Sequence, residues 1–105
     1  MSEISPQDLK ARLDRAQAPL LLDVRQDWET KICRLPNAVH IPIEEIELRV
    51  DELSRDDAIV VYCHAGVRSA AVAQYLQSQG FANVQNLAGG LDLWARTVDP
   101  TMRRY

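Results

Sequence analysis

The fold of this chain is decided by the stretch AIVVYCHAGVRS at residues 58–69. Its first five residues are apolar, which is typical of a buried strand, and the residues that follow the stretch, at 70–76, are typical of a helix. Cys63 therefore lies where a strand ends, and a short loop leads from this cysteine into the N-terminus of a helix. Strand, loop and helix in this order form the repeating unit of a parallel α/β sheet.

The predicted position gives Cys63 the surroundings of a nucleophile. The first N–H groups of a helix have no intrahelical partner, and the helix dipole places partial positive charge there. A thiol in that field loses its proton more readily, and the thiolate is the nucleophilic form. Gly66 permits a backbone turn that other residues resist, and Arg68 adds a fixed positive charge. The loop is therefore predicted to be an anion-binding cradle with a nucleophile at its floor.

The length of 105 residues predicts one domain, at residues 1–105, and the composition is that of a soluble globular protein. Apolar residues make up 47% and charged residues 26%, and the net charge of -3 gives no sign of a nucleic-acid surface. No apolar run approaches the roughly 20 residues that span a bilayer. The first six residues lack the basic and apolar regions of a signal peptide. We therefore expect a cytoplasmic protein without membrane or nucleic-acid partners, whose cysteines stay reduced.

Apolar and amphipathic segments alternate along the chain. Strands are predicted at residues 19–24, 38–41, 58–62 and 84–87. Helices are predicted from Ser5-Pro6 onward and at residues 43–53, 69–79 and 91–96. The alternation predicts an α/β fold, a doubly wound parallel sheet of about five strands with helices on both faces. The polar tail at residues 99–105 is expected to be loosely held.

The carboxyl ends of two predicted strands bring candidate residues together. In doubly wound sheets ligands bind beyond these ends, and both Cys63 and Asp23-Val24-Arg25 lie there. Asp23 is expected to accept backbone hydrogen bonds that order the loop after it, and Arg25 to pair with Glu29 across the turn. We therefore interpret Asp23, Arg25 and Glu29 as supporting residues rather than as catalytic ones.

Five landmarks follow one another in the order of a known family. They are Leu21-Leu22-Asp23-Val24-Arg25, Trp28-Glu29, Leu35-Pro36-Asn37-Ala38 with His40-Ile41-Pro42, the loop from Cys63 to Ser69, and Leu87-Ala88-Gly89-Gly90-Leu91 with Trp94. Together they cover most of the chain, which with them resembles a single-domain rhodanese. The chain departs from that family at Cys33-Arg34, where Gly-His is usual, and at Asn37, where Gly is usual.

The resemblance implies a rhodanese-like fold and a sulfurtransferase. In that family a cysteine takes a sulfane sulfur from a donor, becomes a persulfide and passes the sulfur to a thiophilic acceptor. The implied partners are a small-molecule donor, such as thiosulfate or a persulfide, and the acceptor, with a sulfur-relay protein as a further candidate. No cofactor and no metal are expected, because the two cysteines and two histidines match no zinc pattern.

Cys63 is the predicted catalytic nucleophile, and the rest of its loop is the predicted substrate-binding site. The N–H groups of this loop would hold the persulfide or the donor anion. The loop consists of His64, Ala65, Gly66, Val67, Arg68 and Ser69. A cation at a helix N-terminus needs a compensating anion, which we expect to be bound thiosulfate or the Cys63 thiolate. Ser69 is expected to cap the helix, with donation toward the sulfur as an alternative, and a stabilised thiolate needs no base at His64.

Two other functions stay open beside sulfur transfer. Cysteine-based phosphatases and arsenate reductases also place a thiolate before a helix, but five residues separate their cysteine from the arginine. Here four residues separate Cys63 from Arg68, so fewer N–H groups ring the cysteine. A non-catalytic rhodanese-like binding module is the second alternative, although such modules typically lack the cysteine. Cys33 is interpreted as a small apolar filler, with a role as a second thiol as its alternative, and Trp28 and Trp94 as packing residues.

Overall fold

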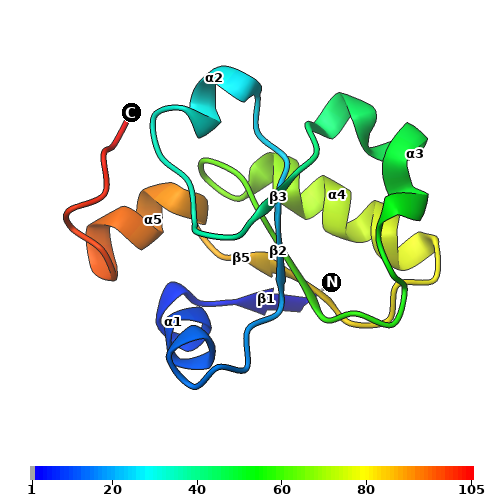
Figure 1. Cartoon of the computed structure of the whole chain (residues 1–105), viewed down its shortest axis with the longest axis horizontal. Helices are drawn as coiled ribbons and strands as arrows, with labels where there is room; N and C mark the ends of the chain where they lie inside the picture. Colours follow the sequence, from blue (N-terminus) through cyan, green and yellow to red (C-terminus); the bar gives the residue numbers. More distant parts are fainter. Residues whose placement is uncertain (1) are drawn as a thin grey trace.

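The computed structural model describes residues 2–105, which fold around a five-stranded parallel sheet in the order β1-β5-β4-β2-β3 (Figure 1). The strands are β1 (Ser2–Ile4), β2 (Leu20–Asp23), β3 (Val39–His40), β4 (Ile59–Tyr62) and β5 (Val84–Leu87). Every neighbouring pair is parallel. The predicted α/β fold with a parallel sheet of about five strands is confirmed.

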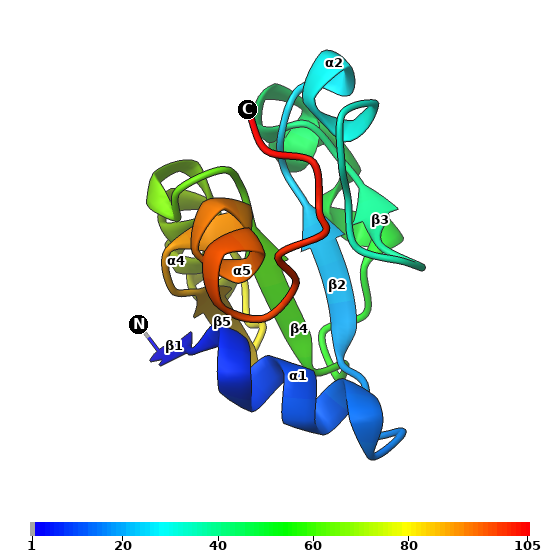
Figure 2. The ribbon, with the colours of Figure 1, turned by 90° about the vertical axis from the view of Figure 1, so that its left-hand side faces the viewer.

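Helices cover both faces of this sheet (Figure 2). They are α1 (Pro6–Asp14), α2 (Asp27–Thr30), α3 (Ile46–Arg49), α4 (Val67–Ser78) and α5 (Gly90–Thr97). One apolar core joins the sheet to α3 and α4, and a second joins it to α1 and α5. Because side chains of a strand alternate between the faces, Ile59 and Val61 of β4 enter the first core, whereas Val60 and Tyr62 enter the second. This two-sided burial explains why β4 is apolar throughout.

Three elements differ from the sequence-based prediction. Strand β1 was not predicted, because only Ile4 of its three residues is buried and its pairing with β5 defines it. The single helix predicted at 43–53 is broken into a 3-10 turn at Ile43–Glu45, α3, and a second 3-10 turn at Val50–Glu52. Its β-branched residues have low helix propensity, which permits the interruption. The short helix α2 was also not predicted.

The carboxyl ends of β2 and β4 lie side by side, because these strands are parallel neighbours in the sheet. Asp23 and Tyr62, the last residues of these strands, are partners in the register between β2 and β4. The segments that follow them, α2 on one side and the Cys63 loop on the other, therefore start from adjacent points of the sheet. Among residues 2–105, no helix has the length and apolar character needed to cross a membrane.

Candidate active site

Cys63 directly follows β4, and the loop after it closes around the sulfur atom. Its side chain is buried, and Sγ accepts hydrogen bonds from the amides of Gly66 at 3.2 Å and Ser69 at 3.4 Å. Gly66 is the N-cap of α4 and has a φ of 96°, in the left-handed region that favours glycine. Helix α4 starts at Val67, earlier than predicted, so its first turn contributes directly to the cradle.

The surroundings of the sulfur favour the thiolate. Burial raises the pKa of the Cys63 thiol, but it is outweighed by the amides of Ser69, Gly66 and Ala65, together with the Ser69 hydroxyl when this turns its hydrogen toward the sulfur. The pKa of Cys63 is therefore below its ordinary value. The exposed side chains of Ala65 and Val67 project away from the core, so these residues offer the loop their backbone rather than their side chains.

We expect Cys63 to titrate below the ~8.5 of a free cysteine. The rate of alkylation by iodoacetamide, measured against pH in a Cys33→Ser background, reports this titration because only the thiolate reacts. The amide donors persist at all accessible pH values, so the inflection of the rate should lie below that of a free cysteine. An inflection at or above the value of a free cysteine would contradict the electrostatic role of the loop.

The start of α5 supports the loop from below. The amides of Leu91 and Asp92 donate to the carbonyl oxygens of Cys63 at 3.0 Å and His64 at 2.9 Å. A Cβ atom added to Gly90 would lie 2.5 Å from the His64 oxygen, so the two backbones can approach only with glycine here. The Gly89-Gly90 pair thus fixes the loop that carries Cys63 against the end of β5.

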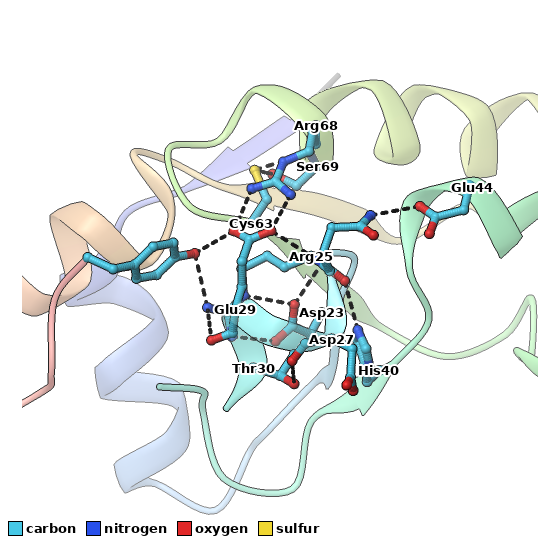
Figure 3. A network of polar contacts seen from close by, with 12 residues as sticks. Asp23, Arg25, Asp27, Glu29, Thr30, His40, Glu44, Cys63, Arg68 and Ser69 are labelled. Carbon is cyan, nitrogen blue, oxygen red and sulfur yellow. Dashed lines mark hydrogen bonds and ion pairs between the residues drawn. The ribbon is translucent and has the colours of Figure 1, made fainter. Parts of the chain in front are cut away.

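The anion that compensates Arg68 is Glu29 of α2 (Figure 3). Both terminal nitrogens of Arg68 donate to the two Glu29 oxygens, at 2.7 and 2.8 Å. The hydrogen bonds from Arg68 lower the pKa of Glu29 to about 2, so this carboxylate is charged at neutral pH. Thiosulfate or the Cys63 thiolate was expected in this role. The forked geometry instead commits the guanidinium to a carboxylate of the protein.

Arg25 pairs with Asp23 rather than with the Glu29 carboxylate, and the predicted pairing of Arg25 with Glu29 is wrong. Both Arg25 and Asp23 are buried, and Arg25 Nη2 lies 2.7 Å from Asp23 Oδ2. Asp23 also accepts the backbone N–H of Arg25 at 3.0 Å, as predicted for a residue that orders a loop. Arg25 donates further to the carbonyl oxygens of Cys33 and Glu29. Its guanidinium thereby shapes the whole segment that carries Glu29.

The tail at residues 99–105 folds back onto the site, and the prediction of a loosely held tail is wrong. The Tyr105 hydroxyl donates to Glu29 at 2.6 Å and accepts from Arg25 at 3.1 Å. Its ring centroid lies 4.3 Å from that of His64 and 5.9 Å from that of the exposed Trp28. These contacts join residues far apart in the chain, so no local pattern could indicate them. They also show that His64 and Trp28 pack against the tail.

Two side chains near the site were interpreted from the sequence as packing residues, Trp94 and Cys33. Trp94 is buried in the core, as predicted. The partly buried Cys33 packs against the same core, in agreement with an apolar filler. Within residues 2–105, the buried His64 Nδ1 has no hydrogen-bond partner.

Ser69 lies inside α4 and does not cap it, so the predicted capping role is wrong. Its hydroxyl lies 3.3 Å from Cys63 Sγ and also donates to Asn86 Oδ1. Asn86, a buried residue of β5, was not predicted as part of the site. The signal that could have found it is a polar side chain on the same face of a predicted strand as the apolar Val84, two residues before it. Asn86 nevertheless reaches the loop only because β5 lies beside β4.

Comparison with known proteins agrees with this geometry. A family model described as "Rhodanese-like domain" matches residues 5–97. A "Sulfurtransferase" of Allochromatium vinosum is 36% identical over 96 residues, covering 91% of this chain and 90% of the relative. Several other curated relatives are longer, and the chain spans only 24–50% of their length.

Solved structures show the same fold. A rhodanese-like domain protein of Staphylococcus aureus matches with a TM-score of 0.86 at 30% identity, covering 100% of this chain and 99% of that one. A rhodanese-related protein of Thermoplasma volcanium matches with a TM-score of 0.86 at 31% identity, covering 93% and 94% of the two chains. Motifs, topology and nearly full-length matches all agree, and the chain belongs to the rhodanese-like domain family.

Proposed function

We propose that this protein is a sulfurtransferase that carries a sulfane sulfur on Cys63 as a persulfide. The observation that supports this most directly is the buried Cys63 Sγ, which receives amide hydrogen bonds from Gly66 and Ser69 at a helix N-terminus. The same donors can stabilise the negative charge of a thiolate and of a persulfide. The sulfurtransferase among the relatives supports the same activity.

The proposed reaction has two displacement steps. The Cys63 thiolate attacks the outer sulfur of the donor, forms a new S–S bond and breaks the old one. The leaving group departs with that electron pair, as sulfite from thiosulfate or as a thiolate from a persulfide. A thiophilic acceptor then attacks the outer sulfur of Cys63–S–S⁻, and the Cys63 thiolate leaves. Each step transfers sulfur without a net oxidant, and covalent catalysis divides one transfer into two easier ones.

The contacts of Arg68 favour sulfur transfer over phosphate chemistry. A cysteine phosphatase uses a planar guanidinium to bind two phosphate oxygens. Here both terminal nitrogens of Arg68 are bound to Glu29, whose side chain is only 3% exposed. Releasing the guanidinium would leave a charged carboxylate unpaired in a largely buried place. Binding a single sulfur atom does not require the guanidinium to leave Glu29. The presence of Cys63 disfavours the other alternative, a non-catalytic binding module.

Sulfur loading of Cys63 tests the proposal. The protein is incubated with thiosulfate, a polysulfide or a low-molecular-weight persulfide, and its intact mass is measured before and after reduction. We expect a gain of one sulfur atom that a reductant removes and that Cys63→Ser prevents. Hydrolysis of an aryl phosphate, measured in parallel, should be negligible. Phosphatase activity without sulfur loading would establish the opposite function, and absence of both would favour the binding module.

Glu29 is expected to limit the use of thiosulfate by neutralising Arg68. Replacing Arg68 with Ala should lower kcat/KM for thiosulfate by less than tenfold, because Glu29 already holds both terminal nitrogens and the donor does not receive the full charged hydrogen bond of about 1.5–3 kcal/mol. Glu29→Gln should act in the opposite direction, because the guanidinium is then free to meet the dianion. A persulfide donor of lower charge should respond less to either change.

The combination of both substitutions separates substrate binding from loop stability. If Arg68 meets the donor, Glu29→Gln raises thiosulfate use only while Arg68 is present. The rate of thiocyanate formation from thiosulfate and cyanide measures this in the single and double variants. Equal losses with thiosulfate and with a persulfide would instead show that Arg68 acts on the loop itself.

A further inference from the structure

Asn86 is a buried polar side chain in direct contact with the residues that surround Cys63. It is 1% exposed and lies opposite Val61 of β4 and Glu3 of β1 in the parallel register. Its Nδ2 donates to the Gly66 carbonyl at 3.1 Å and to Glu3 Oε2 at 3.0 Å. A buried amide with every polar atom bonded has a fixed orientation and restricts its partners.

The partners of Asn86 determine which of its atoms faces Ser69. The Gly66 carbonyl can only accept hydrogen bonds, and Glu3 Oε2 accepts here as well. The amide therefore cannot be turned over without placing its oxygen against two acceptors. Its Oδ1 must therefore face Ser69, where it can only accept a hydrogen bond from the Ser69 hydroxyl.

This arrangement leaves Cys63 in competition with Asn86 for one proton. The Ser69 hydroxyl carries a single hydrogen, and its oxygen lies 3.3 Å from Cys63 Sγ. While Cys63 is a thiol, its S–H can donate to Ser69 and Ser69 can donate to Asn86, so every group is bonded. When the thiol loses its proton to solvent, the Ser69 hydroxyl can stabilise the thiolate only by turning away from Asn86 (Figure 3 shows Cys63 and Ser69).

We propose that Asn86 is a positioning residue for sulfur transfer: its side chain decides whether the Ser69 hydroxyl donates to Asn86 or to the Cys63 sulfur. The proposal rests on Cys63 being the nucleophile. Asn86 makes the thiolate less stable than Ser69 alone would make it. A less stabilised thiolate is a stronger nucleophile, since nucleophilicity falls as the pKa of a thiol falls. Once Cys63 carries sulfur, Sγ is neutral, and the hydroxyl can return to Asn86.

The competition is tested by titrating Cys63 in four proteins, all with Cys33→Ser: the parent, Asn86→Leu, Ser69→Ala and the double variant. Alkylation rate against pH gives the pKa of Cys63. Asn86→Leu frees the Ser69 hydroxyl for the thiolate, so we expect this pKa to fall by about one unit, a roughly tenfold larger thiolate fraction at low pH. The weaker nucleophilicity of the more stabilised thiolate offsets part of this gain in the alkylation rate, so the pKa is taken from the inflection of the pH profile. In the Ser69→Ala background, Asn86→Leu should leave the pKa of Cys63 unchanged. Gln85→Ala, a neighbour on the same strand, serves as the matched control.

The background dependence separates positioning from structural support. Asn86→Leu also removes the hydrogen bond to the Gly66 carbonyl, but it does so with or without Ser69. A shift of equal size in both backgrounds, no shift, or a rise in the pKa would each overturn the proposal. If leucine prevents folding, judged by circular dichroism and thermal unfolding, Asn86→Ala needs less room and gives the same comparison.

The titration needs no sulfur donor, so its outcome is independent of the outcome of the sulfur-loading experiment that tests the proposed function. If the four variants titrate as expected while the parent protein takes up no sulfur, Asn86 still positions the Ser69 hydroxyl, but Cys63 serves a reaction other than sulfur transfer. If sulfur loading is normal but Asn86→Leu shifts both backgrounds equally, the sulfurtransferase stands and the role of Asn86 does not.

Discussion

Replacing Cys63 with Ser is expected to abolish sulfur transfer while the protein stays folded. Serine fits the space that the buried thiol occupies and can accept from the same amides of Gly66 and Ser69. Its hydroxyl cannot form a persulfide, so transfer should fall to the background of the assay, a loss on the order of 10³-fold or more. Thiocyanate formation measures the activity, and thermal unfolding shows that the fold is retained.

Cys33→Ser is the matched control, since it removes the other cysteine of the chain. Cys33 is partly buried, packs against the core and accepts a weak contact from Arg25 at 3.9 Å. We expect this variant to keep most of the activity. Should Cys33→Ser be inactive and Cys63→Ser active, the nucleophile would have been assigned to the wrong cysteine.

Replacing Arg25 with Met is expected to cause the largest loss of stability among these predictions. Arg25 is 0% exposed and Asp23 1% exposed, so the substitution leaves the Asp23 carboxylate charged and unpaired in the core. Breaking a buried ion pair in this way costs about 3–5 kcal/mol, a large part of the roughly 5–15 kcal/mol by which a domain is stable. Urea unfolding measures the free energy of unfolding. A lower midpoint concentration of urea, with an unchanged dependence of the free energy on urea concentration, reports the loss of stability.

Arg49→Met is the control for this prediction, because Arg49 is also an arginine with carboxylate partners. Its side chain is 34% exposed and pairs with Glu45 and Glu52 on the surface, where solvent screens such pairs and they contribute little to stability. The double variant Asp23→Asn with Arg25→Met should regain part of the loss, because the uncompensated charge is gone. Similar losses in the Arg25 and Arg49 variants would contradict the argument from burial.

The main features of the fold follow from local patterns in the sequence. The apolar runs at β2 and β4, the Ser5-Pro6 helix start and the position of Gly66 each depend on neighbouring residues alone. Alternating strands and helices then restrict the chain to a parallel sheet. For the same reason the sequence places Cys63 between a strand end and a helix start, where its thiol is acidified.

The partners of the charged residues depend instead on how distant elements pack. From the sequence, Arg25 and Glu29 are near neighbours and a pairing between them is the natural prediction. In the structure Glu29 pairs with Arg68 of α4, a residue 39 positions further along the chain. Glu29 pairs with Arg68 because β2 and β4 are adjacent and bring α2 close to the Cys63 loop. Arg25 is not available to Glu29, since Asp23 already compensates its charge.

The sequence by itself determined the parallel α/β fold, the family and the candidate nucleophile, because these depend on the order and local pattern of residues. Only the tertiary structure decided that Glu29 neutralises Arg68, that Tyr105 covers His64, and that Asn86 contacts Ser69. Each of these contacts joins segments well separated in the chain, and short strands such as β1 are likewise defined by their partner. A side chain's charge and size are local properties, whereas its partner is set by the packing of the whole sheet.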